Sequence, residues 1–427
     1  MKKYEVDVLI AGSGVAGLYC ALHLRSDLKI LVLSKTELTE TDTYLAQGGI
    51  STALNEKDIP LFVEDTLKAG DYENTREAVN VLAKESIENI KELIGYGLEL
   101  DKHNSELDYT REGAHSVNRI VHQKDETGKA VAETLIAEAK RRKNIELWEH
   151  TTMADIIKDG SRCIGGVLMK SGEIIEVAAK DVVLATGGVG GLFKKSTNHR
   201  ILTGDGVAIA IKNGVELRDS DYIQFHPTVL DKGLENERRF LISESLRGEG
   251  AILVNSKGER FVNELLPRDE VTEAIEKELK KSGEKCVYID ISFMDSEFVK
   301  TRFPAIYQEC LKSGIDMTKD RIPVSPAQHY YMGGIKVDLD GRTSMKNLYA
   351  LGETACTGVH GKNRLASNSL LEGLVFSKRA AKTINETADK IKLVKEGEGY
   401  TLELDKKAVI KELKGSSGRY ENELFSY

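Results

Sequence analysis

The sequence predicts an α/β fold built on a Rossmann-like nucleotide-binding unit, because three apolar runs each end in a glycine turn. The first run, 6–10, leads into the motif GSGVAG at 12–17, and an amphipathic stretch connects this motif to a second apolar run at 30–33. Similar turns close the runs that lie within 181–188 and 348–353. Apolar runs bounded by glycine are typical of parallel strands that are covered on both faces.

The composition indicates a globular protein with more than one domain. A chain of 427 residues is long enough for two or three domains, and its 41% hydrophobic and 30% charged residues exclude disorder as the dominant state. The 38 glycines and only 6 prolines indicate tight turns within folded units. The formal net charge of −8 argues against nucleic acid as the main partner.

The sequence predicts neither a targeting segment nor a metal site. The longest apolar run near the start, 8–11, is far shorter than the ~18 residues of a membrane-spanning helix, so we expect no membrane association. The first residues pass into the glycine motif without a signal-peptide cleavage site. The 5 cysteines are scattered and form no CxxC pair, which favours reduced thiols in the cytoplasm over disulfides, zinc or an iron–sulfur cluster.

The GSGVAG motif predicts a dinucleotide site because it follows a predicted strand and opens a predicted helix. Its glycines let the backbone approach a pyrophosphate, whose charge then lies at the helix N-terminus. The alternative is an ordinary strand-to-helix turn. An acid that would hold a ribose at the end of the second strand is absent, since Ser34 and Lys35 stand there and Glu37 lies beyond them. This departure makes NAD a less suitable cofactor.

Other segments give a coarse outline of the chain. Apolar positions at spacings of three and four predict helices over 76–100 and 129–142, and a later helix over about 369–387. Residues 220–330 mix helical and strand patterns without a nucleotide-type glycine turn, which indicates an inserted domain. Residues 391–427 are rich in Lys, Glu and Gly, and we expect no particular fold for them.

Six further segments carry a resemblance to a known family: 41–50, 111–116, 224–228, 267–269, 329–334 and 363–372. From about residue 5 to 390 the chain resembles the flavoprotein family of succinate dehydrogenase and fumarate reductase, and within it most closely the L-aspartate oxidases. The family fold is an FAD-binding domain interrupted by an α+β capping domain. The resemblance therefore implies an FAD domain over 1–219 and 331–390 and a capping domain over 220–330. A truncated C-terminal tail, 391–427, stands in place of the family's helical domain.

The resemblance implies a non-covalent FAD. Relatives that attach the flavin covalently use a histidine just before the segment Thr-x-x-Ala-x-Gly-Gly, and Asp42 occupies that place here. Asn368 and Ser369 would open a helix whose N-terminus stabilises negative charge on reduced flavin, or they are an ordinary helix cap. The implied cofactor-binding residues are Gly12, Ser13, Gly14, Val15, Ala16, Gly17, Lys35, Asp42, Thr43, Tyr44, Leu45, Ala46, Gln47, Gly48, Gly49, Asp205, Glu353, Ser369 and Leu370.

The resemblance also implies a dicarboxylate pocket. Arginine forms paired, charge-assisted hydrogen bonds with carboxylates, and histidine adds further donors. Taken singly, each of these residues is more often a surface or packing residue. The implied catalytic residues are Arg268, Glu112, His226, His329 and Arg364, and the implied substrate-binding residues are Gln224, Ser243, Glu244 and Ser367.

Glu112 decides between the candidate substrates. Succinate and fumarate carry only carboxylates, which a neighbouring glutamate would repel, whereas aspartate carries an ammonium group that a glutamate attracts. Within the family resemblance, the Arg-Glu-Gly sequence at 111–113 is the aspartate oxidase form. The alternative is that Glu112 points into solvent.

The resemblance implies oxidation of L-aspartate to iminoaspartate by hydride transfer from C2 to FAD N5. Oxygen or fumarate would reoxidise the flavin, and the product would enter NAD biosynthesis through quinolinate, with quinolinate synthase as a candidate partner. One alternative is a soluble fumarate reductase or succinate-oxidising flavoprotein that uses the same pocket. A second, of a different class, is a catalytically silent FAD-binding protein.

Overall fold

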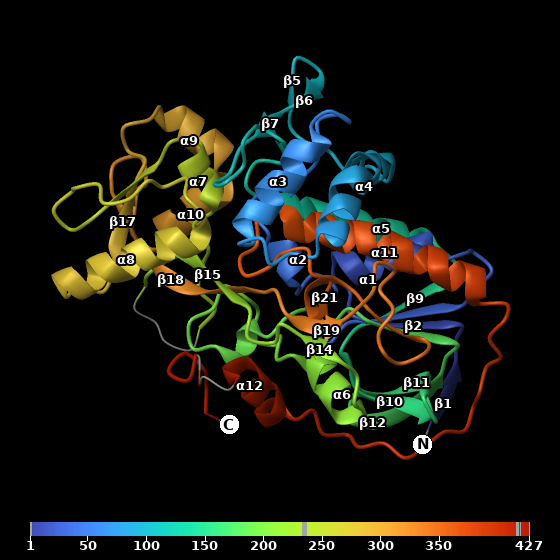
Figure 1. The fold of residues 1–427 in the computed structure, drawn as a ribbon. Helices are drawn as coiled ribbons and strands as arrows, with labels where there is room; N and C mark the ends of the chain where they lie inside the picture. Colours follow the sequence, from blue (N-terminus) through green and yellow to red (C-terminus); the bar gives the residue numbers. More distant parts are fainter. Residues whose placement is uncertain (1, 233–236, 416–417, 419, 427) are drawn as a thin grey trace.

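The protein is described by a computed structural model that covers residues 2–232, 237–415, 418 and 420–426 (Figure 1). Its centre is a five-stranded parallel sheet, which confirms the predicted α/β class. The strands, in spatial order, are β20 (Leu348–Ala350), β13 (Asp181–Leu184), β2 (Val8–Ala11), β3 (Ile30–Leu33) and β9 (Ile145–Trp148). The three predicted strand-to-glycine turns therefore follow neighbouring strands β2, β13 and β20.

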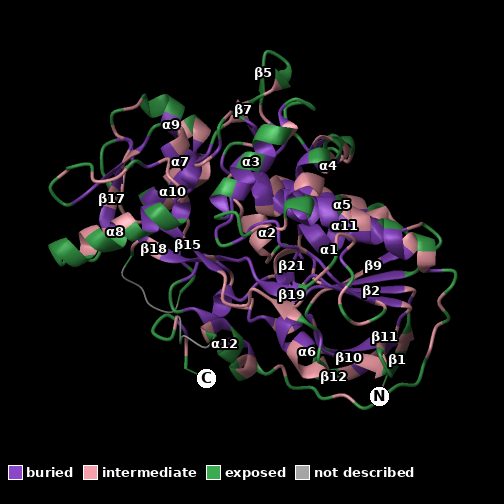
Figure 2. Ribbon diagram, viewed as in Figure 1, coloured by how far each residue is buried: buried purple, intermediate pink, exposed green. Residues whose placement is uncertain are grey.

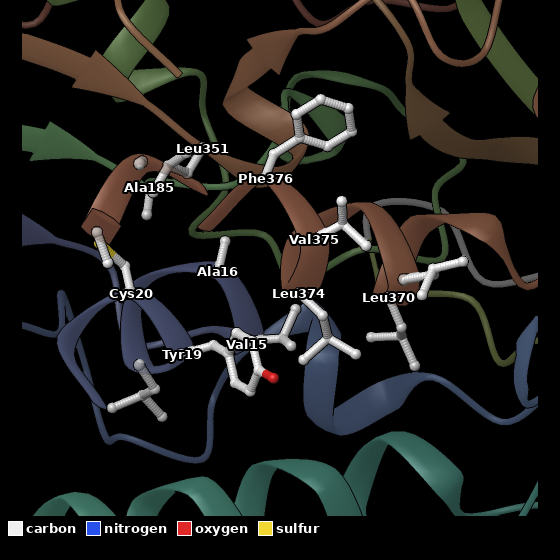
Figure 3. Close-up of a cluster of buried hydrophobic side chains, with 14 of the residues drawn as sticks. Val15, Ala16, Tyr19, Cys20, Ala185, Leu351, Leu370, Leu374, Val375 and Phe376 are labelled. Carbon is white, nitrogen blue, oxygen red and sulfur yellow. The ribbon is translucent and has the colours of Figure 1, made fainter. Parts of the chain in front are cut away.

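Helices cover one face of this sheet. Val8 and Ile10 of β2 belong to a core cluster shared with α1 and α11, and Figure 3 shows Val15 and Tyr19 of α1 near Leu374 of α11. The covering helices are α1 (Val15–His23), α3 (Ile59–Ala69), α4 (Arg76–Gly95), α5 (Thr127–Arg141) and α11 (Asn368–Thr387). The three helices predicted from apolar spacing are confirmed as α4, α5 and α11, although α4 ends earlier than expected.

A second β layer covers the other face. Leu9 and Ala11 of β2 pack in a different cluster, with Met153 and Leu168 from a four-stranded sheet. That sheet has the order β1 (Lys2–Glu5), β12 (Glu173–Ala178), β11 (Arg162–Lys170) and β10 (Thr151–Asp159). Helix α6 (Asp205–Asn213) and the small sheet of β14 (Leu217–Arg218), β19 (Gly334–Lys336) and β21 (Ala355–Cys356) complete this side. Burial on both faces explains why β2 and β3 are continuous apolar runs.

A separate four-stranded sheet is formed between residues 223 and 331. Its order is β15 (Ile223–Leu230), β18 (Ile322–Tyr331), β17 (Val287–Asp290) and β16 (Ile252–Val254). Helices α7 (Glu244–Gly248), α8 (Arg268–Ser282), α9 (Ser296–Arg302) and α10 (Pro304–Lys312) accompany it, and its apolar cluster is distinct from the other cores (Figure 1). We propose this segment as the capping domain.

Short elements connect these layers near the glycine turns. They are α2 (Asp42–Leu45), β4 (Ile50–Ser51), β5 (Lys102–His103), β6 (Glu106–Leu107), β7 (Tyr109–Thr110), β8 (Ile120–Val121) and the 3₁₀ turns Gly190–Leu192 and Gly352–Thr354. Strands β4, β8 and β7 form a small antiparallel sheet. Between β7 and β8, the fully buried Arg119 pairs with Asp58 at 2.9 Å and with Asp65. This ion-pair cluster anchors the loop that contains Glu112.

Part of the C-terminal tail forms a helix that packs on the protein, although its composition led us to expect no particular fold. Helix α12 (Lys406–Lys414) buries Val409, Ile410 and Leu413 in a cluster with Phe193 and Val207. Figure 2 shows this buried stripe on α12 beside exposed connecting chain. In the described part of the chain, no helix is both long and apolar enough to span a membrane.

Replacing Leu413 with alanine should lower the free energy of unfolding by about 2–5 kcal/mol, since it empties a fully buried site. The matched variant Leu402→Ala, at a position that is 36% exposed in the same tail, should have little effect. Urea denaturation followed by circular dichroism measures both. Equal effects of the two variants would contradict the packing of α12 against the protein.

Candidate functional site

The site is a single deep pocket between the glycine turn of β2 and the strands β15 and β18. It encloses about 1690 Å³ of free space, part of it open to solvent. Its lining runs from the glycine turn after β2 to the arginine and histidine side chains of β15, β18 and α8, so an extended ligand and a second, smaller one can both contact it. Most of the predicted site residues line it: Gly12, Ser13, Gly14, Val15, Ala16, Lys35, Asp42, Thr43, Leu45, Ala46, Gln47, Gly48, Gly49, Glu112, Asp205, His226, Ser243, Glu244, Arg268, His329, Glu353, Arg364, Ser367, Ser369 and Leu370.

The glycine turn presents the start of α1 to the pocket. Gly12 has φ +125°, and a Cβ there would overlap the carbonyl oxygen of Ala185. Gly14 lies at the N-cap of α1 and has no side chain that could cap the helix. The N–H of Val15 donates to Thr43 Oγ1 at 3.0 Å. Backbone N–H groups at a helix start form an anion site suited to a pyrophosphate. Gly17 does not line the pocket, because it packs against the backbone oxygen of Gly12.

Lys35, which follows β3, contacts Asp205 at the start of α6. Lys35 Nζ pairs with Asp205 at 2.8 Å and donates to the backbone oxygen of Ile201 at 2.9 Å. This pair brings together two predicted cofactor-binding residues that are 170 positions apart. Tyr44 is the exception in its segment, since it does not line the pocket and its hydroxyl donates to Glu133 at 3.1 Å.

Polar atoms without partners face the same pocket. Asp42 Oδ1 accepts from the N–H of His199 at 3.0 Å, whereas its Oδ2 and Gln47 Oε1 are buried and unpaired within the described residues. Burial raises the pKa of Asp42 to about 7. Burial, followed by the nearby Asp42, raises the pKa of Glu353 to about 8. Unpaired buried oxygens are costly, so they indicate a hydrogen-bonding ligand.

These observations fit FAD. The glycine turn accommodates a pyrophosphate, the pocket lining extends from this turn to the start of α11, and the unpaired oxygens of Asp42 and Gln47 offer acceptors. Helix α11 begins at the far side of the pocket, after Ser367, whose φ is +63° and whose side chain caps no N–H. Ser369 and Leu370 in its first turn line the pocket, where the helix N-terminus favours negative charge.

Two histidines lie together on neighbouring strands. His226 of β15 and His329 of β18 have ring centroids 5.1 Å apart in an edge-to-face arrangement. Burial and then Arg268 lower the pKa of each well below its usual value, so both rings are neutral. His226 Nδ1 accepts from the N–H of Thr228 at 3.2 Å, so Nε2 carries the proton. This Nε2 is buried without a partner in the described structure, which leaves it as a donor for a ligand.

Arg268 is held by an ion-pair chain. Its Nε donates to Glu244 Oε2 at 2.6 Å, and Arg247, fully enclosed behind it, lies 3.5 Å from the same oxygen. Burial raises the pKa of Glu244, but Arg247 and Arg268 outweigh burial and leave it below its usual value. The pair therefore fixes the orientation of an ionised carboxylate and a guanidinium at the pocket wall.

Gln224 positions the arginines instead of lining the pocket. Its Oε1 accepts from Arg268 Nη1 at 2.9 Å. Its Nε2 donates to Asn363 Oδ1 at 2.7 Å and to the backbone oxygen of Arg364 at 2.8 Å. The residue predicted to bind substrate thus ties β15 to the segment before α11.

Glu112 is buried at the pocket wall and does not point into solvent. Its side chain accepts from Ser367 Oγ at 2.6 Å, and the residue is 2% exposed. Burial, followed by repulsion from Glu244, raises its pKa above the usual value. A cation that arrives beside Glu112 would favour its ionised form and offset part of this rise in its pKa.

Several residues that line the pocket escaped the sequence prediction, among them Thr197 and Tyr330. Thr197 lies outside every motif, yet its Oγ1 is 2.7 Å from His329 Nδ1 and fixes that ring. Tyr330 follows His329 directly, within a segment that carried the family resemblance, so that segment was the available signal. Its ring lies 4.5 Å from the guanidinium carbon of Arg364.

Replacing Gly12 with alanine should abolish FAD retention, because a side chain there collides with backbone and disfavours the positive φ. The matched variant Gly95→Ala, where a Cβ meets open space, should keep a full complement of flavin. Flavin absorbance per protein after gel filtration measures both, with circular dichroism to verify folding. A folded Gly12→Ala protein with full flavin would contradict this account of the turn.

Comparisons with known proteins agree with the pocket. A family model described as "FAD binding domain" matches residues 7–370. The L-aspartate oxidase of Clostridium acetobutylicum is 54% identical over 428 residues, which cover 98% of this chain and 99% of that protein. The L-aspartate oxidase of Clostridium perfringens is 55% identical and covers 92% of this chain and 89% of that protein.

Solved structures show the same fold. A structure of E. coli quinol fumarate reductase superposes with a TM-score of 0.86 at 30% identity, over 91% of this chain and 71% of that one. The Sdh1 structure of Mycobacterium smegmatis superposes with a TM-score of 0.77 at 32% identity, over 96% of this chain and 72% of that one. The chain matches the FAD-binding family model over most of its length, and it is 54% and 55% identical to the two clostridial L-aspartate oxidases. It therefore belongs to the L-aspartate oxidase family of FAD-binding proteins.

Proposed function

We propose that the protein oxidises L-aspartate to iminoaspartate. The observation that carries the proposal is a buried glutamate, Glu112, in a pocket that also presents two arginines, Arg268 and Arg364, and two histidines. Two carboxylates and one ammonium group are the charges that such a wall complements. The 54% identity to an L-aspartate oxidase supports the same substrate.

Each substrate group has a suitable partner. Arg268 and Arg364 present charge-assisted donors to the two carboxylates, and neutral His226 adds its free Nε2–H. Glu112 forms an ion pair with the incoming ammonium group, and its burial shields this pair from water. Succinate would leave Glu112 without a cationic partner. The pocket therefore discriminates by charge between two dicarboxylates of similar size.

The chain's residues orient the substrate for oxidation. The residues of the glycine turn and of the first turn of α11 would hold FAD, which would supply the acceptor for the hydride that leaves C2 of aspartate, with the ammonium group losing a proton before or during this transfer. Arg268 polarises a carboxylate, since Glu244 and Gln224 fix its guanidinium in place. The start of α11 at Ser369 and Leu370 stabilises negative charge at this end of the pocket.

We further propose that oxygen or fumarate reoxidises the flavin. In this proposal the reaction occurs in the cytoplasm and is the first step of NAD biosynthesis through quinolinate. Quinolinate synthase would be the partner that consumes the product. The support is the family membership together with the chemistry of iminoaspartate, which must be used before it hydrolyses.

Replacing Glu112 with glutamine tests the substrate assignment. The dissociation constant for aspartate should rise at least about tenfold, because the ammonium group loses a buried anionic partner. The affinity for succinate should stay equal or improve. For succinate, flavin difference absorbance during titration measures binding. For aspartate, which reduces the flavin, the concentration dependence of the anaerobic reduction rate gives the dissociation constant. Glu106→Gln, at an exposed position just before this loop, is the matched control. Equal losses for both ligands would contradict the proposed role, and unchanged aspartate binding would favour the fumarate reductase alternative.

The raised pKa of Glu112 predicts opposite pH trends for the two ligands. As the pH rises through this pKa, the carboxylate ionises, so succinate affinity should fall and aspartate affinity should rise. Calorimetric titrations across a pH series measure the trend for succinate, and the concentration dependence of the anaerobic flavin reduction rate at each pH measures the trend for aspartate. Glu112→Gln should remove the difference between them. Parallel trends for both ligands in the unsubstituted protein would show that another group controls binding.

A further inference from the structure

A buried trio of Tyr330, Glu372 and His360 lies directly behind the arginine that faces the pocket. The guanidinium of Arg364 rests over the ring of Tyr330, with 4.5 Å between the guanidinium carbon and the ring centroid. Arg364 is itself buried, and its Nε has no hydrogen-bond partner in the described structure. Its one side-chain hydrogen bond in that part runs from Nη1 to Ser369 Oγ at 2.9 Å. The aromatic ring is therefore a large part of what holds this cation.

The Tyr330 ring is in turn held from behind. Its hydroxyl donates to Glu372 Oε2 at 3.0 Å. Tyr330 lies at the end of β18, and Glu372 lies in the second turn of α11, 42 residues later. This hydrogen bond fixes the strand and the helix to each other at the point where Arg364 lies between them and the pocket.

Glu372 is oriented by two more donors. His360 Nε2 donates to Oε2 at 2.9 Å, and Thr357 Oγ1 donates to Oε1 at 2.5 Å. The His360 ring also meets the Tyr330 ring edge-to-face at 5.4 Å. Burial raises the pKa of Glu372, but His360 and the hydrogen bonds outweigh burial and leave it below its usual value. An ionised carboxylate with 1% exposure thus accepts three hydrogen bonds.

We propose that Glu372, with His360, is a positioning residue for dicarboxylate recognition: it holds the Tyr330 ring as a fixed floor for Arg364. The inference rests on the proposed function for its choice of ligand, and it assigns residues beyond those that touch the substrate. A glutamine cannot replace Glu372, since one side of an amide donates and leaves at least one of the three donors without an acceptor. Without its hydrogen bond to Glu372, the Tyr330 ring can move, and the guanidinium of Arg364 can then rotate. This rotation weakens the two parallel hydrogen bonds that an arginine forms with a carboxylate.

The chain offers a matched control trio on the far side of α1. Tyr19 donates to Glu92 Oε2 at 2.7 Å, and His23 Nε2 lies 3.0 Å from the same oxygen. None of these three residues lines the pocket. Removing the same chemical groups there reports what the loss of a tyrosine–glutamate hydrogen bond does to the protein away from Arg364.

The test compares Tyr330→Phe and Glu372→Gln with Tyr19→Phe and Glu92→Gln in the FAD-loaded protein. The first two should raise the dissociation constant for succinate about tenfold, with full flavin content. The two controls should stay within about twofold. For aspartate turnover, KM should rise while kcat stays close to that of the unsubstituted protein, because Arg364 binds a carboxylate and not the reacting bond.

A double variant shows whether Glu372 acts on Arg364 through Tyr330 or independently of Tyr330. If Glu372 acts through Tyr330, the combined Tyr330→Phe and Glu372→Gln protein should bind succinate no more weakly than either single variant. Additive losses would overturn the proposed coupling, as would pocket variants that match the controls. Should Glu372→Gln fail to fold, Tyr330→Phe keeps the ring and still decides the question. Succinate binding needs no turnover, so a protein that binds succinate but is not reduced by aspartate would refute the proposed function alone.

Discussion

The burial of two arginines in one pocket is the constraint on which the rest of the site depends. Arg268 and Arg364 repel each other, and burial followed by this repulsion lowers the pKa of Arg364 to about 10. Taking such cations out of water is costly unless anions compensate for them. Glu244 does so by direct contact with Arg268, and the nearby Glu353 and Glu112 compensate in part for Arg364. Buried ion pairs and hydrogen bonds thus hold both guanidinium groups in place at the pocket wall.

The fold satisfies this constraint by joining elements that are distant in sequence. Pairing of β15 with β18 places His226 and His329 side by side, and α8 begins with Arg268. The segment before α11 supplies Arg364, while Gln224 links both arginines. The loop between β7 and β8 brings Glu112 against Ser367, and the glycine turn of β2 opens the other half of the pocket. Our proposal therefore places cofactor and substrate in one cavity, as direct hydride transfer requires.

Local features of this protein could be predicted from the sequence, whereas features set by tertiary packing could not. The strands β2, β3, β13 and β20 and the helix α11 are confirmed because buried parallel strands and amphipathic helices leave local apolar patterns. The folding of α12 was missed, since its three buried residues, Val409, Ile410 and Leu413, form too short a pattern among charged residues. The trio behind Arg364 was also missed, because a hydrogen bond spanning 42 residues leaves no spacing to find.

The central claim is that this pocket oxidises an amine and not a simple dicarboxylate. Anaerobic reduction tests it most directly: the FAD-loaded protein is mixed, without oxygen, with L-aspartate or with succinate, and the flavin absorbance is followed. Our account predicts rapid bleaching by L-aspartate and none by succinate, with iminoaspartate or its hydrolysis products formed in proportion to reduced flavin. Bleaching by succinate without any response to L-aspartate would contradict the role of Glu112 and place the protein with the dicarboxylate reductases.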